Sequence, residues 1–189
     1  MKRVFSEIDL VLAQSEEHRK RFIHIGVDPD KVITTGNIKY FRPMQDAVDI
    51  EKQNAITFGS FKEKELPAVY AAMGSLLKMF PDYTFFIAPR ELHLSSLIEK
   101  DLSASARITR YSSRNTEDAG SNIVIVDTVG DLLNLYKRSK VAFVGGSLAP
   151  YGGQNILEPL FFSTPVLFGP HIENFRAVAE RVIDLNAGL

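Results

Sequence analysis

The sequence contains no cysteine and no tryptophan among its 189 residues. The absence of cysteine excludes disulfide bonds, thiolate zinc sites and cysteine nucleophiles. Without tryptophan, the chain lacks the strongest aromatic anchor for a membrane interface. No stretch reaches the roughly 20 apolar residues that a membrane-spanning helix needs. Glu7 lies where a signal peptide would need an apolar run, so the chain is expected to be soluble.

Neither sign of charge dominates, because 22 Lys and Arg residues stand against 23 Asp and Glu residues. A nucleic-acid partner recognised through bulk phosphate attraction is therefore not expected. His93 and His171 lack further metal ligands at a useful spacing, so no metal is expected either. The sequence also lacks the G-x-S-x-G, P-loop and G-x-G-x-x-G motifs, which argues against hydrolase, P-loop and dinucleotide-binding functions.

With 45% hydrophobic and 24% charged residues, the composition is that of a globular protein with a substantial core. Segments with strand and helix patterns alternate almost throughout, and this order predicts an α/β fold with a Rossmann-like, doubly wound parallel sheet. Residues 41–54 are the predicted linker. Three continuous apolar runs predict strands covered on both faces at the centre of the sheet: residues 123–126, 141–144 and 165–168.

Ligands of an open parallel sheet bind beyond the carboxyl ends of its strands. Four turns at such positions stand out: residues 59–62, 88–90, 127–130 and 145–155. The last carries four glycines in nine residues before a helix expected over 154–162, so its amides are expected to point at an anion. One helical turn beyond Asn155, the Glu158 carboxylate can accept hydrogen bonds from a vicinal diol. Alternatively, the glycines only form a tight crossover and Glu158 is a surface or capping acid.

Other residues in these turns are also candidates for ligand binding. Arg90 directly follows a predicted strand, where its guanidinium suits a phosphate or carboxylate. Gly130 precedes Asp131 at the start of a helix whose amides can bind a base carbonyl, unless Asp131 is simply the N-cap. Three further side chains can donate to an anionic ligand or remain solvated: Ser60, Lys62 and Lys39.

Several stretches together resemble the 3-deoxy-D-manno-octulosonic acid (Kdo) transferases of lipid A assembly. The main ones are residues 127–136 (DTVGDLLNLY), 142–148 (AFVGGSL), 152–159 (GGQNILEP) and 165–175 (PVLFGPHIENF), and shorter pieces before them agree in order. The resemblance implies that residues 1–189 are mainly one domain, the second, donor-binding half of a two-domain GT-B glycosyltransferase. Its ligand would be the cytidine monophosphate (CMP) part of CMP-Kdo.

The resemblance also implies roles for individual residues in the donor site. It places Arg90 at the phosphate. It places Val129, Gly130 and Leu132 at the base, and Asn155 and Glu158 at the ribose-phosphate side. Further members of the implied site are Ser60, Lys39, Gly153 and Gln154. The family commonly has His in place of Gln154 and Thr-His in place of Phe61-Lys62, so Lys62 is expected to supply positive charge.

The same resemblance sets expectations for the whole enzyme. It would transfer Kdo from CMP-Kdo to a lipid A precursor, without a cofactor or metal, at the cytoplasmic face of the inner membrane. The general base, the acceptor surface and the membrane contact are expected in an N-terminal domain outside this sequence, and the final C-terminal helices are expected to be missing as well. The fragment alone is expected to be inactive. The alternatives are a GT-B hexosyltransferase or epimerase that uses a UDP-sugar, and a non-catalytic nucleotide-sugar binding module.

Overall fold

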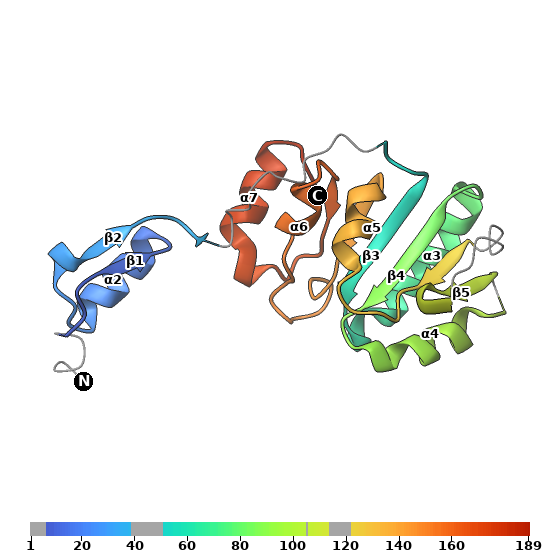
Figure 1. The fold of residues 1–189 in the computed structure, drawn as a ribbon, viewed down its shortest axis with the longest axis horizontal. Coiled ribbons are helices and arrows are strands. Elements are labelled where there is room, and N and C mark those ends of the chain that lie inside the picture. Colours follow the sequence, from blue (N-terminus) through green and yellow to red (C-terminus); the bar gives the residue numbers. More distant parts are fainter. Residues whose placement is uncertain (1–6, 39–50, 105, 114–121) are drawn as a thin grey trace. The chain divides into compact units, whose positions relative to one another are not determined.

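The computed structural model describes residues 7–38, 51–104, 106–113 and 122–189. The chain divides into two compact units, Met1–Asp46 and Ala47–Leu189, which Figure 1 shows in blue and in cyan to red. The boundary falls inside the predicted linker. The prediction of one domain across residues 1–189 differs from this division, because the first unit has its own small core around Ala13, Val27 and Val32.

The first unit follows the predicted strand–helix–strand order. Strands β1 (Val11–Ala13) and β2 (Val32–Thr34) pair in parallel, with helix α2 (Glu16–His24) and a 3₁₀ turn (Pro29–Lys31) between them in sequence. Ser15 is the N-cap of α2, and its hydroxyl accepts a hydrogen bond from the His18 amide at 3.2 Å. A side-chain acceptor at this position stabilises a helix start, so the predicted capped helix is confirmed.

The second unit is built on a six-stranded parallel sheet. Its strands lie in the order β5 (Ile108–Arg110), β6 (Ile123–Ile125), β4 (Thr84–Pro89), β3 (Ala55–Phe61), β7 (Val141–Val144) and β8 (Val166–Leu167). From β3 the chain first builds the sheet towards β4, β6 and β5, and then crosses back to β7. The order therefore reverses between β3 and β7, where open α/β sheets bind their ligands. This topology confirms the predicted α/β class.

One part of the predicted sheet order is wrong. Residues 165–168 were expected at the centre of the sheet because all four are apolar or proline. Instead, β8 ends the six-strand order. On its outer side lie the last residues of the chain, which form an isolated bridge between Gly188 and Val166 and backbone hydrogen bonds that join Ala187 and Leu189 to Val166. The side chain of Leu167 is consequently 43% exposed.

Helices cover both faces of the sheet (Figure 1). Helices α3 (Leu66–Met79) and α4 (Ser95–Leu102) pack on one face, and α5 (Leu132–Arg138), α6 (Leu157–Leu160) and α7 (Arg176–Asp184) pack on the other. Short 3₁₀ turns precede α3, α4 and α7 and follow β5, at Glu63–Glu65, Leu92–Leu94, Glu173–Phe175 and Tyr111–Ser113. Alternate residues of a central strand serve the two cores: Phe85 and Ile87 belong to the α3 side and Phe86 to the α5 side. This division explains why β4 is apolar along most of its length.

Candidate functional site

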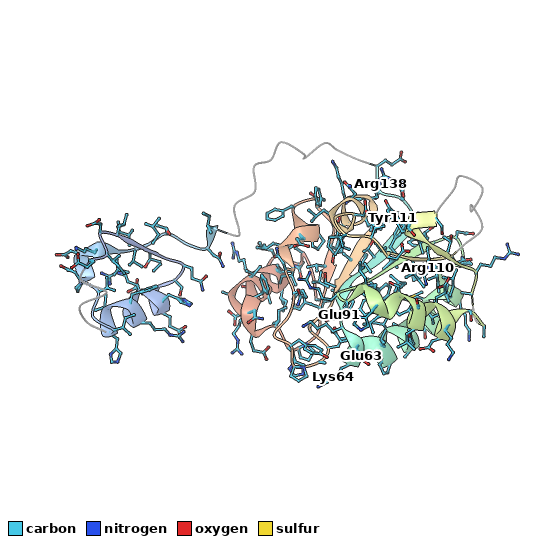
Figure 2. The ribbon with its side chains drawn as sticks, turned by 60° about the horizontal axis from the view of Figure 1, so that its bottom comes forward. Glu63, Lys64, Glu91, Arg110, Tyr111 and Arg138 are labelled. Atoms are coloured by element: carbon cyan, nitrogen blue, oxygen red, sulfur yellow. The ribbon has the colours of Figure 1, made fainter. Side chains whose placement is uncertain are left out.

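The four turns predicted from the sequence lie along one edge of the sheet. Strands β6, β4, β3 and β7 are consecutive neighbours and run in parallel, so their carboxyl ends meet at the same edge. Along it come the turns with Val129 and Gly130 after β6, Arg90 after β4, Ser60 in β3, and residues 145–158 after β7. Lys39 lies outside the described residues. Figure 2 shows Glu63, Lys64 and Glu91 at this edge and Arg138, at the end of α5, at the opposite one.

Strand β3 ends in a strained bulge. The pairing of β3 with β4 shifts between Gly59 and Phe61, and Ser60 between them adopts a φ of 57°. This left-handed conformation is unfavourable for a residue with a side chain, and bulges of this kind redirect side chains at binding sites. The Ser60 side chain forms a hydrogen bond with the Tyr136 hydroxyl.

Tyr136 links two of the predicted residues. Its side chain is fully buried, and a methyl group on Gly59 would lie 1.9 Å from its hydroxyl oxygen, so the ring packs directly on β3. Burial, and then the charge of the Glu158 carboxylate, raise the pKa of the Tyr136 phenol above its ordinary value. Tyr136 therefore stays neutral between Ser60 and Glu158, and it connects α5 with the end of β3 and with α6.

The turn before α6 differs from the prediction. A helix from Gln154 was expected, but α6 begins at Leu157. The amides of Gly153 and Gln154 instead donate back to the carbonyls of Gly146 at 2.7 Å and Gly145 at 3.1 Å. The Asn155 side-chain oxygen accepts from the Leu157 amide at 3.2 Å, and its amide nitrogen donates to Glu158 at 3.2 Å. The amides of Gly153 and Gln154 are thus not available to an anion, and that expectation was wrong.

Glu65 accepts hydrogen bonds from three further amides of this loop. Its carboxylate is 1% exposed. One oxygen accepts from the amides of Lys62 at 2.8 Å and Gly146 at 2.7 Å. The other accepts from the amides of Ser147 at 3.0 Å and Leu148 at 2.8 Å. A protein carboxylate, and not a ligand, therefore holds the start of the β7–α6 loop.

Sequence reasoning missed both Glu65 and Tyr136. The spacing of Lys62 and Glu65 fits a local capping box, in which a side chain at the third helical position accepts from the N-cap amide. That signal predicts only the bond to the Lys62 amide, because the other three amides lie more than 80 positions later. Tyr136 stands in a predicted helix, but nothing local connects it with Gly59.

Strands β3 and β7 approach unusually closely at the switch point, and we expect a substitution there to be destabilising. A methyl group on Gly145 would lie 2.2 Å from the Phe61 Cα atom. Because backbone atoms cannot move aside cheaply, Gly145→Ala is expected to lower the free energy of unfolding, measured in urea, by about 3 kcal/mol. Gly74→Ala is the control, since Gly74 lies in α3 with no atom within 4 Å of the new methyl; it should stabilise by about 0.5–1 kcal/mol. Equal stability of the two variants would contradict the close approach.

Arg90 presents an unpaired cation at the same edge. Its amide donates to the Phe61 carbonyl at 2.8 Å, which places it beside the end of β3. The side chain is exposed, and within the described residues its guanidinium forms no hydrogen bond or ion pair. Arg90 and Glu158 therefore lie on the two sides of the carboxyl end of β3, with Ser60 between them.

The turn after β6 is open. Val129 is 85% exposed. Gly130 has a φ of 97°, and a methyl group there would meet no atom within 4 Å. Leu132, in the first turn of α5, is partly buried. This turn requires glycine for its backbone conformation and leaves free space beside it.

Two hollows are lined by other residues. One of about 630 Å³ belongs to the first unit, where Gln14, His18 and Asn37 are among its lining residues. The other, of about 380 Å³, is an apolar groove between α3 and strands β3, β7 and β8, where Phe58, Phe143 and Leu167 line it. Neither is lined by any of the predicted donor-site residues. In the described part of the chain, no group of three or more His, Cys, Asp or Glu side chains gathers as a metal site would.

Comparisons with known proteins find relatives that match almost the whole chain. The model of a family described as 3-deoxy-D-manno-octulosonic-acid transferase (kdotransferase) matches residues 1–42. The 3-deoxy-D-manno-octulosonic acid transferase of Chlamydophila psittaci is 34% identical over 203 residues, which cover 97% of this chain and 45% of the relative. Over nearly all of its length, the chain is similar to Kdo transferases. The Kdo transferase of Haemophilus influenzae is 28% identical and is covered to 47%, so the chain spans about half the length of the curated relatives it matches.

Solved structures agree with this family. The C-terminal CMP-Kdo binding domain of WaaA from Acinetobacter baumannii superimposes with a TM-score of 0.65 at 28% identity, covering 75% of this chain and 73% of that domain. The UDP-GlcNAc 2-epimerase of Neisseria meningitidis has a TM-score of 0.50 at 14% identity, covering 94% of this chain and 53% of the epimerase. At that identity the likeness shows the fold alone. The predicted Rossmann-like parallel sheet is thereby confirmed. Among the residues described, no helix has the length and apolar character to span a bilayer.

Proposed function

We propose that this chain supplies the donor-binding half of an enzyme that transfers Kdo from CMP-Kdo to a lipid A precursor. The observation that carries the proposal is the row of four turns at one sheet edge, centred on the switch point between β3 and β7. Its support is the likeness of the chain to a domain solved as a CMP-Kdo binding domain. Within the chain we assign donor binding to residues 47–189.

Each turn has a proposed role in binding the donor. Arg90 binds the phosphate, because it is the unpaired guanidinium beside β3. The open turn after β6 takes the cytosine, through Val129, Gly130 and Leu132. Asn155 and Glu158 take the ribose side. Gly153 and Gln154 contribute close backbone approach in place of amide donation, and Ser60 and Lys39 complete the proposed site.

The proposed reaction forms a bond between an acceptor hydroxyl oxygen and the anomeric carbon of Kdo, and it breaks the bond from that carbon to the phosphate oxygen. CMP leaves with the electron pair, and the hydroxyl proton passes to a general base. We place that base, the lipid acceptor surface and the contact with the cytoplasmic face of the inner membrane outside this chain. Arg90 would act on the leaving group, because negative charge grows on the phosphate as the bond breaks.

Nucleotide binding by the 189-residue chain tests the proposal. Calorimetry with CMP, UMP and UDP should show CMP binding at least about tenfold more tightly than UMP, because the two bases present opposite hydrogen-bonding groups at one ring position. The chain alone should show no Kdo transfer. Tighter binding of UDP would indicate a UDP-sugar enzyme, and binding of none of the three would contradict a nucleotide-sugar site altogether.

A further inference from the structure

Two lysine side chains lie against one aromatic ring at the switch point. The ammonium nitrogen of Lys62 is 4.6 Å from the centroid of the Tyr151 ring, and that of Lys64 is 5.9 Å from it. Both distances are within the range of cation–π attraction. Lys62 follows directly on β3, whereas Tyr151 belongs to the β7–α6 loop. The ring therefore joins the turns on the two sides of the switch point.

The backbone below these side chains is held in place. A single Glu65 carboxylate oxygen accepts from the Lys62 amide at 2.8 Å and from the Gly146 amide at 2.7 Å. It ties the turn that carries Lys62 to the loop that carries Tyr151. Such support from buried groups orients a binding side chain before the ligand arrives.

Both ammonium groups lack a countercharge. Among the residues that the structure describes, neither Lys62 nor Lys64 forms an ion pair. Glu63 lies between them in sequence but is exposed. Figure 2 shows it with Lys64 at the edge of the sheet where the strands have their carboxyl ends. Two like charges on one ring repel each other, and an anion between or beside them would relieve this repulsion and gain charge-assisted hydrogen bonds.

The position of Lys62 next to Arg90 suggests which anion is bound. The Arg90 amide donates to the carbonyl of Phe61, the residue before Lys62, at 2.8 Å. Two cationic side chains, Lys62 and Arg90, thus arise from the positions directly after the neighbouring strands β3 and β4. In CMP-Kdo the phosphate and the sugar carboxylate are bonded to the same anomeric carbon, so this donor requires two adjacent cationic groups.

Resting on the proposed function, we propose that Lys62, backed by Lys64 and Tyr151, binds the carboxylate of the Kdo moiety while Arg90 binds the phosphate. The pair of lysines selects a donor whose sugar is an acid. A neutral sugar attached to the same nucleotide would leave both ammonium groups without a partner, which costs binding energy in a site built for a charge.

The test compares two phosphodiesters of cytidine, one with the Kdo carboxylate and one with no carboxylate; the Lys62 variants then separate the contribution of the carboxylate from that of the rest of the sugar. The 189-residue chain is titrated with freshly prepared CMP-Kdo and with the methyl ester of CMP, a phosphodiester without a carboxylate. The wild type should bind CMP-Kdo at least about tenfold more tightly. Lys62→Met should abolish this preference and leave the affinity for the methyl ester unchanged, and Lys62→Arg should retain it. Lys64→Met should reduce it by a smaller factor.

Lys78→Met is the matched control, because Lys78 is an exposed lysine in the last turn of α3. It should change neither affinity. Lys62→Gln, checked by its thermal unfolding, replaces Lys62→Met if the latter does not fold. An equal loss of affinity for both ligands would show that Lys62 binds the phosphate and would overturn the proposal, as would an undiminished preference for CMP-Kdo. If the wild type binds neither nucleotide, the proposed function itself fails.

Discussion

Glu65→Gln is expected to lower the free energy of unfolding by about 2–4 kcal/mol. The substitution keeps one carboxyl oxygen and replaces the other by an NH₂ group. Whichever way the amide turns, two backbone N–H groups then face a donor in place of an acceptor. A buried N–H group that loses its partner costs about 1–3 kcal/mol. Glutamine, a conservative replacement elsewhere, is therefore disruptive here.

Hydrogen exchange separates this effect from a general loss of stability. In Glu65→Gln, either the Gly146 amide or the amides of Ser147 and Leu148 should lose more protection, relative to the wild type, than the amides of the central strands, because the new NH₂ group faces one of these two sets. Glu63→Gln is the matched control: it changes the same side chain two residues earlier, on an exposed position, and should alter stability by less than about 0.5 kcal/mol. Unchanged protection at the three loop amides in Glu65→Gln would contradict the role assigned to the carboxylate.

The regular elements of the sheet could be predicted because their signals are local. Continuous apolar runs such as Ile123–Val126 predict strands, and the alternation with helices predicts a parallel sheet. The parallel order then places every strand-to-helix turn at one edge, so the position of the candidate site followed as well. Among the strands, the place of β8 in the sheet was misjudged, since an apolar run does not reveal whether a second neighbour lies beyond it.

The detailed contacts within the site could not be predicted because they join distant positions. Glu65 meets Gly146 and Ser147 across more than 80 residues, and the Tyr136 ring fills the space left by Gly59. A glycine-rich turn is typical of anion binding, but here internal carbonyls and a glutamate engage most of its amides. The same glycines serve close backbone approach, which neither composition nor spacing distinguishes from ligand binding.

This use of the amides makes Arg90 more important to the proposed site than the sequence suggested. If the backbone N–H groups of Gly146–Leu148, Gly153 and Gln154 are all engaged within the protein, the phosphate of a donor must be held mainly by side chains. Arg90 is exposed and unpaired at the carboxyl end of β4, next to Phe61. A guanidinium can form two parallel hydrogen bonds with a phosphate, which an ammonium cannot.

Arg90→Ala is therefore expected to weaken CMP binding by the 189-residue chain about 10- to 100-fold, because a charge-assisted hydrogen bond contributes about 1.5–3 kcal/mol. Its free energy of unfolding should stay within about 0.5 kcal/mol of the wild type, since no partner in the described residues is lost. The CMP affinity of Arg90→Lys should lie between those of the wild type and Arg90→Ala, because lysine keeps the positive charge but cannot form two parallel hydrogen bonds with the phosphate. Arg107→Ala is the matched control. It removes an exposed arginine immediately before β5, at the opposite end of the strands, and should leave CMP affinity unchanged.

In an active enzyme containing this chain, Arg90→Ala should cut turnover about 100-fold or more. Unaltered CMP affinity, or a loss matched by Arg107→Ala, would remove Arg90 from the phosphate site.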